Sequence, residues 1–90
     1  MRLKQEEIEF LKKEILKYDK NAEIYLFGSR VDDSKKGGDI DILVKGNLSI
    51  KEIIKVRVGF FKRFGEQKLD IIIYKDDPFC NYILKKAIAL

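Results

Sequence analysis

Asp39 and Asp41 stand one residue apart in the segment GGDIDILV, which otherwise has the composition of a buried β-strand. Side chains alternate between the two faces of a strand, so both carboxylates project to the same side, with Cα atoms roughly 6.5–7 Å apart. Two anions that close repel each other and are unfavourable to desolvate unless a cation lies between them. Because carboxylate oxygens are ligands that suit Mg²⁺ and Mn²⁺, the pair predicts a metal site.

A third carboxylate, Asp70, interrupts the apolar run LDIII in the same way. Alone, it could be an edge-strand residue that faces water. Beside Asp39 and Asp41, however, it would complete a patch of three buried carboxylates that needs one or two divalent cations. Two cations about 3.5–4 Å apart, bridged by carboxylates, are the usual arrangement for displacement at phosphorus. The three aspartates are therefore the candidate catalytic residues and metal ligands.

Gly28, Ser29 and Arg30 follow a short apolar stretch and are the candidate nucleotide-binding residues. Glycine lets a phosphate approach the backbone, and the serine hydroxyl can donate a hydrogen bond. Gly-Ser is also a common turn dipeptide, and the P-loop pattern GxxxxGK[ST] is absent from the sequence. Arg30 could pair with phosphate oxygens or be a solvated loop residue. Lys35 and Lys36 could attract a triphosphate, although solvation of the loop is the simpler explanation.

Composition narrows the chemistry further. The 90 residues suffice for one small domain, which we take to span residues 1–90. The sequence has no histidine, which excludes Ser-His and Cys-His nucleophiles. Its single cysteine, Cys80, cannot form an internal disulfide, and we expect it to be a small buried hydrophobic residue. The net charge of +4 could favour a phosphate-bearing partner, but no basic cluster with interleaved aromatic residues predicts direct nucleic-acid binding. No apolar run approaches the ~20 residues of a membrane span and no signal peptide is recognisable, so we expect a cytoplasmic protein.

Hydrophobic periodicity and breaker residues divide the chain into six elements. Ser49 and Glu52 form a capping box that begins a helix, and Gly65 is the expected end of that helix. Asp77 and Pro78 begin the last helix. The predicted fold is an α/β (α+β) domain with a short mixed sheet of three strands, or of four, and helices packed against it. The expected order is α-β-β-α-β-α: helix 3–18, strand 22–27, strand 39–45, helix 50–64, strand 68–74 and helix 78–90.

Connection lengths predict how these strands pair. A loop of about ten residues joins the first two strands, most simply as antiparallel neighbours. The helix between the second and third strands favours a parallel pair with a right-handed crossover. The end of the first strand and the starts of the other two then meet at one edge of the sheet. We therefore expect Gly28, Ser29, Asp39, Asp41 and Asp70 to converge.

In this order and context, Gly28-Ser29, Asp39-Ile40-Asp41 and a strand bearing Asp70 resemble the signature of the DNA polymerase β-like nucleotidyltransferase superfamily. The short chain resembles its smallest branch, the minimal nucleotidyltransferase (MNT) domains, over nearly its whole length. The gap between Gly-Ser and the first aspartate is one residue shorter than in many members, which a surface loop absorbs easily. The resemblance implies the polymerase β-like nucleotidyltransferase fold.

It also implies nucleotidyl transfer from ATP, or another nucleoside triphosphate, with two Mg²⁺ ions. By this resemblance Gly28 and Ser29 would hold the β- and γ-phosphates, and Asp39 and Asp41 would ligate both ions. Asp70 would ligate the catalytic ion and help to deprotonate the acceptor hydroxyl. MNT domains commonly act as antitoxins of helical HEPN toxins, and several pairs transfer AMP onto a tyrosine of the toxin. The implied function is therefore a protein adenylyltransferase that silences a HEPN-type partner by AMPylation.

Two other functions stay open. The chain could be a non-catalytic antitoxin or nucleotide-binding subunit that neutralises or assists a partner by complex formation. It could also be the nucleotide-binding subunit of a larger transferase that acts on RNA or a small molecule. So small a domain has little wall around an acceptor, so we expect another chain, or a second copy, to complete the site. The aromatic residues Phe60, Phe61, Phe64, Phe79 and Tyr82 could be core or could form that contact surface.

Overall fold

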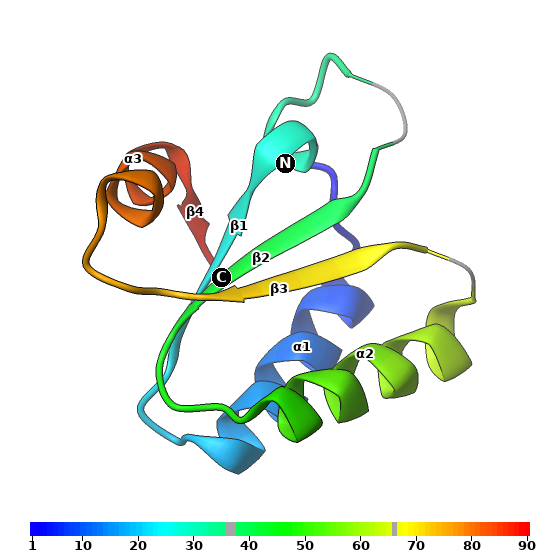
Figure 1. The fold of residues 1–90 in the computed structure, drawn as a ribbon. Helices are drawn as coiled ribbons and strands as arrows, with labels where there is room; N and C mark the ends of the chain where they lie inside the picture. Colours follow the sequence, from blue (N-terminus) through cyan, green and yellow to red (C-terminus); the bar gives the residue numbers. More distant parts are fainter. Residues whose placement is uncertain (36–37, 66) are drawn as a thin grey trace.

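The computed structural model describes residues 1–35, 38–65 and 67–90, so the predicted loop residues Lys36 and Gly37 lie outside the described residues. A mixed four-stranded sheet forms the centre, and helices lie on both of its faces (Figure 1). No helix among the described residues is both long and apolar enough to cross a membrane. The elements in chain order are α1 (Gln5–Tyr18), β1 (Glu23–Phe27), the 3₁₀ helix η1 (Gly28–Val31), β2 (Ile40–Lys45), α2 (Ile50–Phe64), β3 (Leu69–Ile73), α3 (Pro78–Lys86) and β4 (Ile88–Ala89).

The strand order in the sheet is β3-β2-β1-β4. β1 pairs with β2 in the antiparallel sense, and β2 pairs with β3 in the parallel sense across the α2 crossover. Both predicted pairings are confirmed. The sheet also has a fourth strand, which the sequence had left as an alternative to three. β4 runs antiparallel to the other edge of β1.

The prediction that the last helix continues to the C-terminus is wrong. α3 ends at Lys86, and Ala87 is already extended, with φ −78° and ψ 156°. The edge of β1 has free backbone groups, and pairing with β4 satisfies some of them. Leu90 continues this pairing, because its N–H donates to the carbonyl of Ile24 at 2.9 Å, and its side chain packs against the core. Tertiary pairing has therefore overridden the helical periodicity.

Both predicted ends of α2 and the predicted start of α3 are confirmed. The Ser49 hydroxyl accepts from the Glu52 N–H at 3.2 Å, and the Glu52 carboxylate accepts from the Ser49 N–H at 2.8 Å. Gly65 ends α2 with φ +83°, a conformation that glycine adopts without a Cβ clash. At α3, the Asp77 carboxylate accepts from the Cys80 N–H at 2.7 Å.

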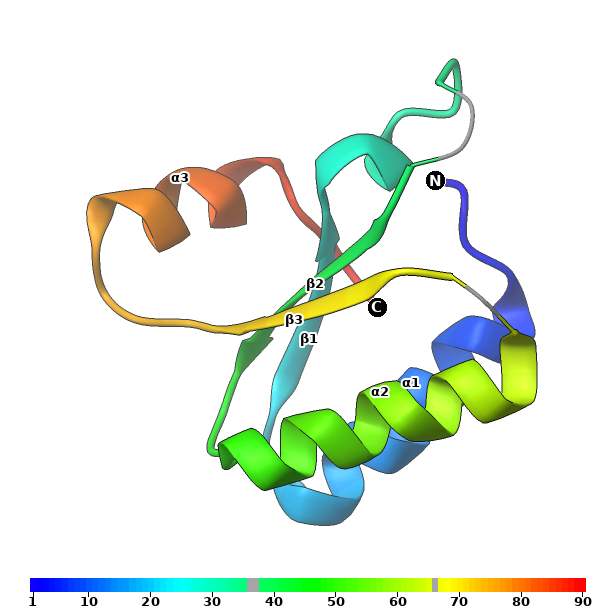
Figure 2. The ribbon, with the colours of Figure 1, turned by 45° about the vertical axis from the view of Figure 1, so that its right-hand side comes forward.

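The helices leave the two sheet faces unequally covered. α1 and α2 pack together against one face, and the shorter α3 lies against the other (Figure 2). The main core fills the first layer, with Phe60 fully buried and Phe64 packed against it. On the α3 side a smaller cluster holds Leu43, Ile83 and Cys80, which is buried as predicted. Of the five aromatic residues that could be core or contact surface, Phe60 and Phe64 therefore belong to the core, whereas Phe61, Phe79 and Tyr82 are exposed.

Candidate active site

β1 ends where β2 and β3 begin, and this edge of the sheet carries the predicted residues (Figure 1). Phe27, the last residue of β1, lies opposite Asp41, and Asp41 lies beside Asp70. Gly28 follows Phe27 directly, and Asp39 immediately precedes β2. The strand register therefore brings three separate segments of the sequence together, as their connection lengths predicted.

The pleat of the sheet decides which face carries the carboxylates. In β2, Ile42 lies in the main core under α1 and α2, whereas Leu43 belongs to the α3 cluster. Asp41 is two residues before Leu43 and therefore shares its face. In β3, Asp70 is two residues before Ile72, which also packs against the α3 cluster. Both carboxylates consequently lie on the α3 side, where the sheet is less covered.

Gly28 lies directly against one of these carboxylates. Its φ is +78°, and a Cβ added at this position would overlap with Oδ2 of Asp41. Glycine is therefore required at this position for two reasons, namely the positive φ of the backbone and the close approach of the Asp41 carboxylate. The contact holds the turn that follows β1 against the carboxylate of β2.

Ser29 follows Gly28 in η1 and lies against a second glycine. A Cβ on Gly38, whose φ is +89°, would overlap with the Ser29 hydroxyl oxygen. The Ser29 carbonyl accepts hydrogen bonds from Arg2 and from the Asp32 N–H, which fixes the backbone of η1. The hydroxyl thus lies where the segment that leads into β2 passes η1, close in sequence to Asp39. Its role in phosphate binding stays a prediction.

Arg30 braces this corner of the molecule. Its guanidinium donates to the carbonyl of Arg2 at 2.9 Å, to the carbonyl of Gly38 at 3.2 Å and to the side chain of Gln67 at 3.4 Å. These bonds connect η1 to the N-terminal segment and to the residues before β2 and β3. Arg30 is therefore not a purely solvated loop residue, and its predicted contact with phosphate stays untested beside this bracing role.

The three aspartates differ in exposure, which corrects the expectation of three buried carboxylates. The side chains of Asp39 and Asp70 are 48% and 39% exposed, and Asp41 is only partly buried. Burial raises the pKa of Asp41, the charges of Asp70 and Asp39 raise it further, and Lys68 opposes them. Both effects are what an anion experiences among other anions in a partly desolvated site.

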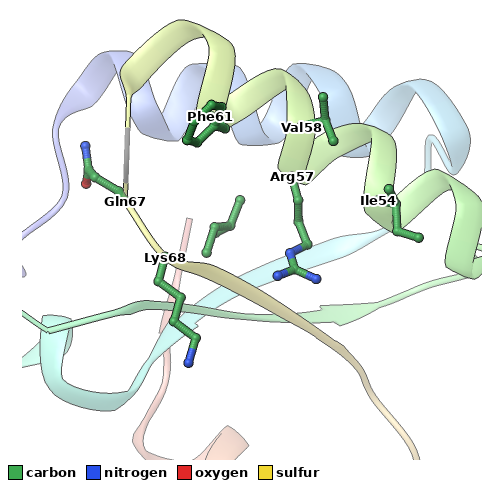
Figure 3. Close-up of a pocket in the computed structure, with 7 residues that line it drawn as sticks. Ile54, Arg57, Val58, Phe61, Gln67 and Lys68 are labelled. Atoms are coloured by element: carbon green, nitrogen blue, oxygen red, sulfur yellow. The ribbon is translucent and has the colours of Figure 1, made fainter.

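Lys68 supplies positive charge within this patch and was not predicted. Its ammonium lies 3.6 Å from Oδ2 of Asp39 and 3.9 Å from Oδ2 of Asp70. Lys68 is one of the residues that line a groove between α2 and β3, and Figure 3 shows its side chain pointing away from α2. The strand pattern could have revealed it, because Lys68 precedes Asp70 by two residues and so shares its face. The ammonium marks a position where a cation is favourable between two carboxylates.

These residues fit a divalent cation in their chemistry, although the described side chains form no ready-made metal site of three ligands. The donors are all carboxylate oxygens, which suit Mg²⁺, and an ammonium already bridges two of them. Asp39, Asp41 and Asp70 are therefore the residues that would hold a divalent cation.

No curated protein matches the sequence. The family model of the nucleotidyltransferase domain, however, matches residues 8–89, which include Gly28, Ser29 and all three aspartates of the site. The three helices and the mixed four-stranded sheet have the arrangement of the polymerase β-like nucleotidyltransferase fold. The chain therefore belongs to the nucleotidyltransferase domain family.

Proposed function

We propose that this domain is a Mg²⁺-dependent adenylyltransferase that transfers AMP from ATP to a hydroxyl of a partner protein. The acceptor in this proposal is a tyrosine of a HEPN-type toxin, and the domain is its antitoxin. The observation that carries the proposal is the contact of Gly28 with Asp41 beside Asp39 and Asp70, within a nucleotidyltransferase domain. This contact places two features side by side. One is a backbone turn that a phosphate can approach, and the other is a group of carboxylates that can hold the cation bound to that phosphate.

Each residue then has a defined task. Bound Mg²⁺ would lower the pKa of the acceptor hydroxyl and neutralise the departing pyrophosphate. The backbone at Gly28 and the hydroxyl of Ser29 would orient the β- and γ-phosphates, and Asp39 and Asp41 would hold the cation. Asp70 would accept the proton of the hydroxyl while the new bond from its oxygen to the α-phosphorus forms and the bond to pyrophosphate breaks. In-line placement of the reactants is the main contribution of the protein.

An exposed apolar stripe on α2 supports the need for a partner. Ile50, Ile54, Val58 and Phe61 recur at helical spacing and are each between 45% and 77% exposed. We call them the α2 stripe. Three of them line a groove of about 270 Å³ between α2 and β3, together with Arg57 and Lys68 (Figure 3). A contiguous apolar face of this kind is typical of a protein interface.

The charges around the α2 stripe indicate the chemistry of that partner. The other exposed residues of α2 include Lys51, Lys55, Arg57 and Lys62. An amphipathic helix with apolar residues along one side and acidic residues beside them would complement this surface. Because Lys68 extends from the same groove to Asp39 and Asp70, the partner would dock next to the candidate active site.

The proposal is tested by following the label from α-³²P-ATP. The protein is incubated with Mg²⁺ and the product of the adjacent reading frame, in parallel with Asp39→Ala/Asp41→Ala. Asp76→Ala is the matched control, since this exposed aspartate lies beyond the opposite end of β3. We expect label on a tyrosine of the partner with the wild type and the control, and none with the double variant.

The α2 stripe also favours a second function, in which the chain neutralises its partner by contact alone. A stable complex that inhibits the partner without transferring label, with the wild type and the double variant equally effective, would establish that function instead. The same result would contradict the transferase proposal.

A further inference from the structure

A pocket of about 310 Å³ opens between η1 and α3. Phe27, Gly28, Val31 and Asp32 line one part of it, and Tyr82, Ile83 and Lys86 of α3 line the other. Most of the surface inside is apolar. The volume is at the lower end of the range of small-molecule pockets, about 300–1,000 Å³. The pocket therefore suits a flat apolar group rather than a further charged one.

The pocket continues directly from the candidate active site. Gly28 is part of its wall, and the same residue lies against the Asp41 carboxylate. Phe27 lies opposite Asp41 in the sheet and packs against the α3 cluster. A group in the pocket would thus lie on one side of Gly28, with the Asp41 carboxylate on the other.

Tyr82 offers an aromatic ring at this pocket. It is 60% exposed, although it sits on the helix face that turns toward η1. The Lys86 ammonium donates a hydrogen bond to its hydroxyl at 2.9 Å and lies 4.9 Å from the ring centroid. This bond also lowers the pKa of Tyr82. The ring is therefore held in place from the next turn of α3 while much of its surface stays open to a ligand.

We propose that this pocket binds the base of the nucleoside triphosphate, with the Tyr82 ring as its stacking partner. The inference rests on the proposed function and names the subsite that the Gly28 turn and the carboxylates leave unassigned. The order of groups in a nucleotide supports it: the base is joined through the sugar to the phosphates, and the pocket is joined through Gly28 to the proposed phosphate site. Stacking on an aromatic ring is favourable for every base, so the subsite provides affinity more than base selectivity.

The alternative occupant is the aromatic side chain of the acceptor. The pocket shares its wall with the turn proposed to hold the phosphates, whereas an acceptor must attack from the side opposite the pyrophosphate. This consideration favours the base.

Calorimetry with two ligands separates base binding from phosphate binding. Affinities for ATP and for inorganic tripolyphosphate, both with Mg²⁺, are measured for the wild type, Tyr82→Ala and Tyr82→Phe. Phe79→Ala is the matched control, because Phe79 is an equally exposed aromatic residue of α3 (62%) that does not line the pocket. We expect Tyr82→Ala to weaken ATP binding about tenfold and to leave tripolyphosphate binding unchanged. Tyr82→Phe and Phe79→Ala should bind both ligands as the wild type does.

Three results would overturn the inference: unchanged ATP affinity in Tyr82→Ala, an equal loss for both ligands, or a loss confined to the Michaelis constant for the protein acceptor. The last would assign the pocket to the acceptor. A wild type that binds neither ligand would overturn the inference together with the proposed function. If the expected pattern appears but no AMP reaches any partner, the base subsite stands and the transferase proposal fails.

Discussion

At the scale of single residues, Gly28 and Gly65 offer a natural comparison. Both have positive φ, +78° and +83°, but a Cβ at Gly28 would overlap with Asp41, whereas a Cβ at Gly65 would meet open space. Gly65→Ala should lower the free energy of unfolding by about 1 kcal/mol through backbone strain alone. Gly28→Ala should lower it by about 2–3 kcal/mol, because it must also displace the carboxylate. Urea denaturation measures both, and equal losses would show that the contact with Asp41 contributes nothing.

The raised pKa of Asp41 predicts a stabilising substitution at the site. Burial raises the pKa first, and the charges of Asp70 and Asp39 add to it. A carboxyl group with a higher pKa in the folded state binds its proton more tightly there, so the free energy of unfolding falls as pH rises through that pKa. Asp41→Asn removes the charge at nearly constant shape, and at pH 7 we expect it to raise the free energy of unfolding.

The pH dependence distinguishes this cause from a packing effect. Below the usual range of aspartate pKa values the wild-type carboxyl is protonated in both states, and the advantage of Asp41→Asn should disappear. Denaturation curves at several pH values without Mg²⁺ test this. An advantage that persists in acid, or its absence at pH 7, would contradict the electrostatic explanation. Active sites commonly lower the stability of the fold in this way, because a functional carboxylate must stay charged where burial disfavours its charge.

Lys68 should compete with the metal. Its ammonium lies within 4 Å of both Asp39 and Asp70, so a cation must break these ion pairs before it can bind. Exposed pairs contribute about 0.2–1 kcal/mol each, so Lys68→Gln should raise the affinity for Mn²⁺ about 3- to 10-fold. Mn²⁺ titration followed by electron paramagnetic resonance measures it. Lys75 is an exposed lysine beyond the other end of β3, and Lys75→Gln should leave the affinity for Mn²⁺ unchanged. A weaker affinity in Lys68→Gln would show that Lys68 helps to bind the metal instead of competing with it.

At the scale of elements, the sequence predicted the helix ends that capping residues determine and the strand pairings that connection lengths determine. The capping residues fixed the start of α2 and α3, and connection lengths fixed the pairing of β1, β2 and β3. β4 could not be predicted in this way, because two residues pair only where the distant edge of β1 offers partners. Likewise the contact of Gly28 with Asp41 and the pocket beside Tyr82 arise only once η1 and α3 meet the sheet.

The α2 stripe should act in partner binding and not in folding. Phe61 is 52% exposed and lines the groove beside β3, so Phe61→Ser should change the free energy of unfolding by less than about 0.5 kcal/mol. It should weaken the complex with the partner about tenfold or more, because buried aromatic anchors dominate interfaces. Isothermal calorimetry measures the complex, with Phe79→Ser of α3 as the exposed control. Unchanged affinity in Phe61→Ser would place the partner on another surface, and loss of a dimer in light scattering would show that the stripe binds a second copy.

At the scale of the whole molecule, the candidate site belongs to the centre of the fold and not to an appendage. Its residues come from the ends of β1, β2 and β3, which are adjacent in the sheet, and from η1 between them. The same strands carry the main core on their other face. A ligand at this edge should consequently bind only the folded domain and stabilise it as a unit.

Ligand binding should therefore raise the melting temperature by the full amount that its binding free energy sets. A ligand at about 100 times its dissociation constant stabilises the folded state by about 2.7 kcal/mol, and in a domain of this size 1 kcal/mol shifts the melting temperature by about 4–8 °C. ATP with Mg²⁺ at that concentration should raise it by roughly 10 °C or more, measured by scanning calorimetry. Asp39→Ala/Asp41→Ala should abolish the shift, and Asp76→Ala should retain it. A calorimetrically bound nucleotide that leaves the melting temperature unchanged would mean that it binds a locally unfolding segment, and the site would then have to lie away from the strand edge.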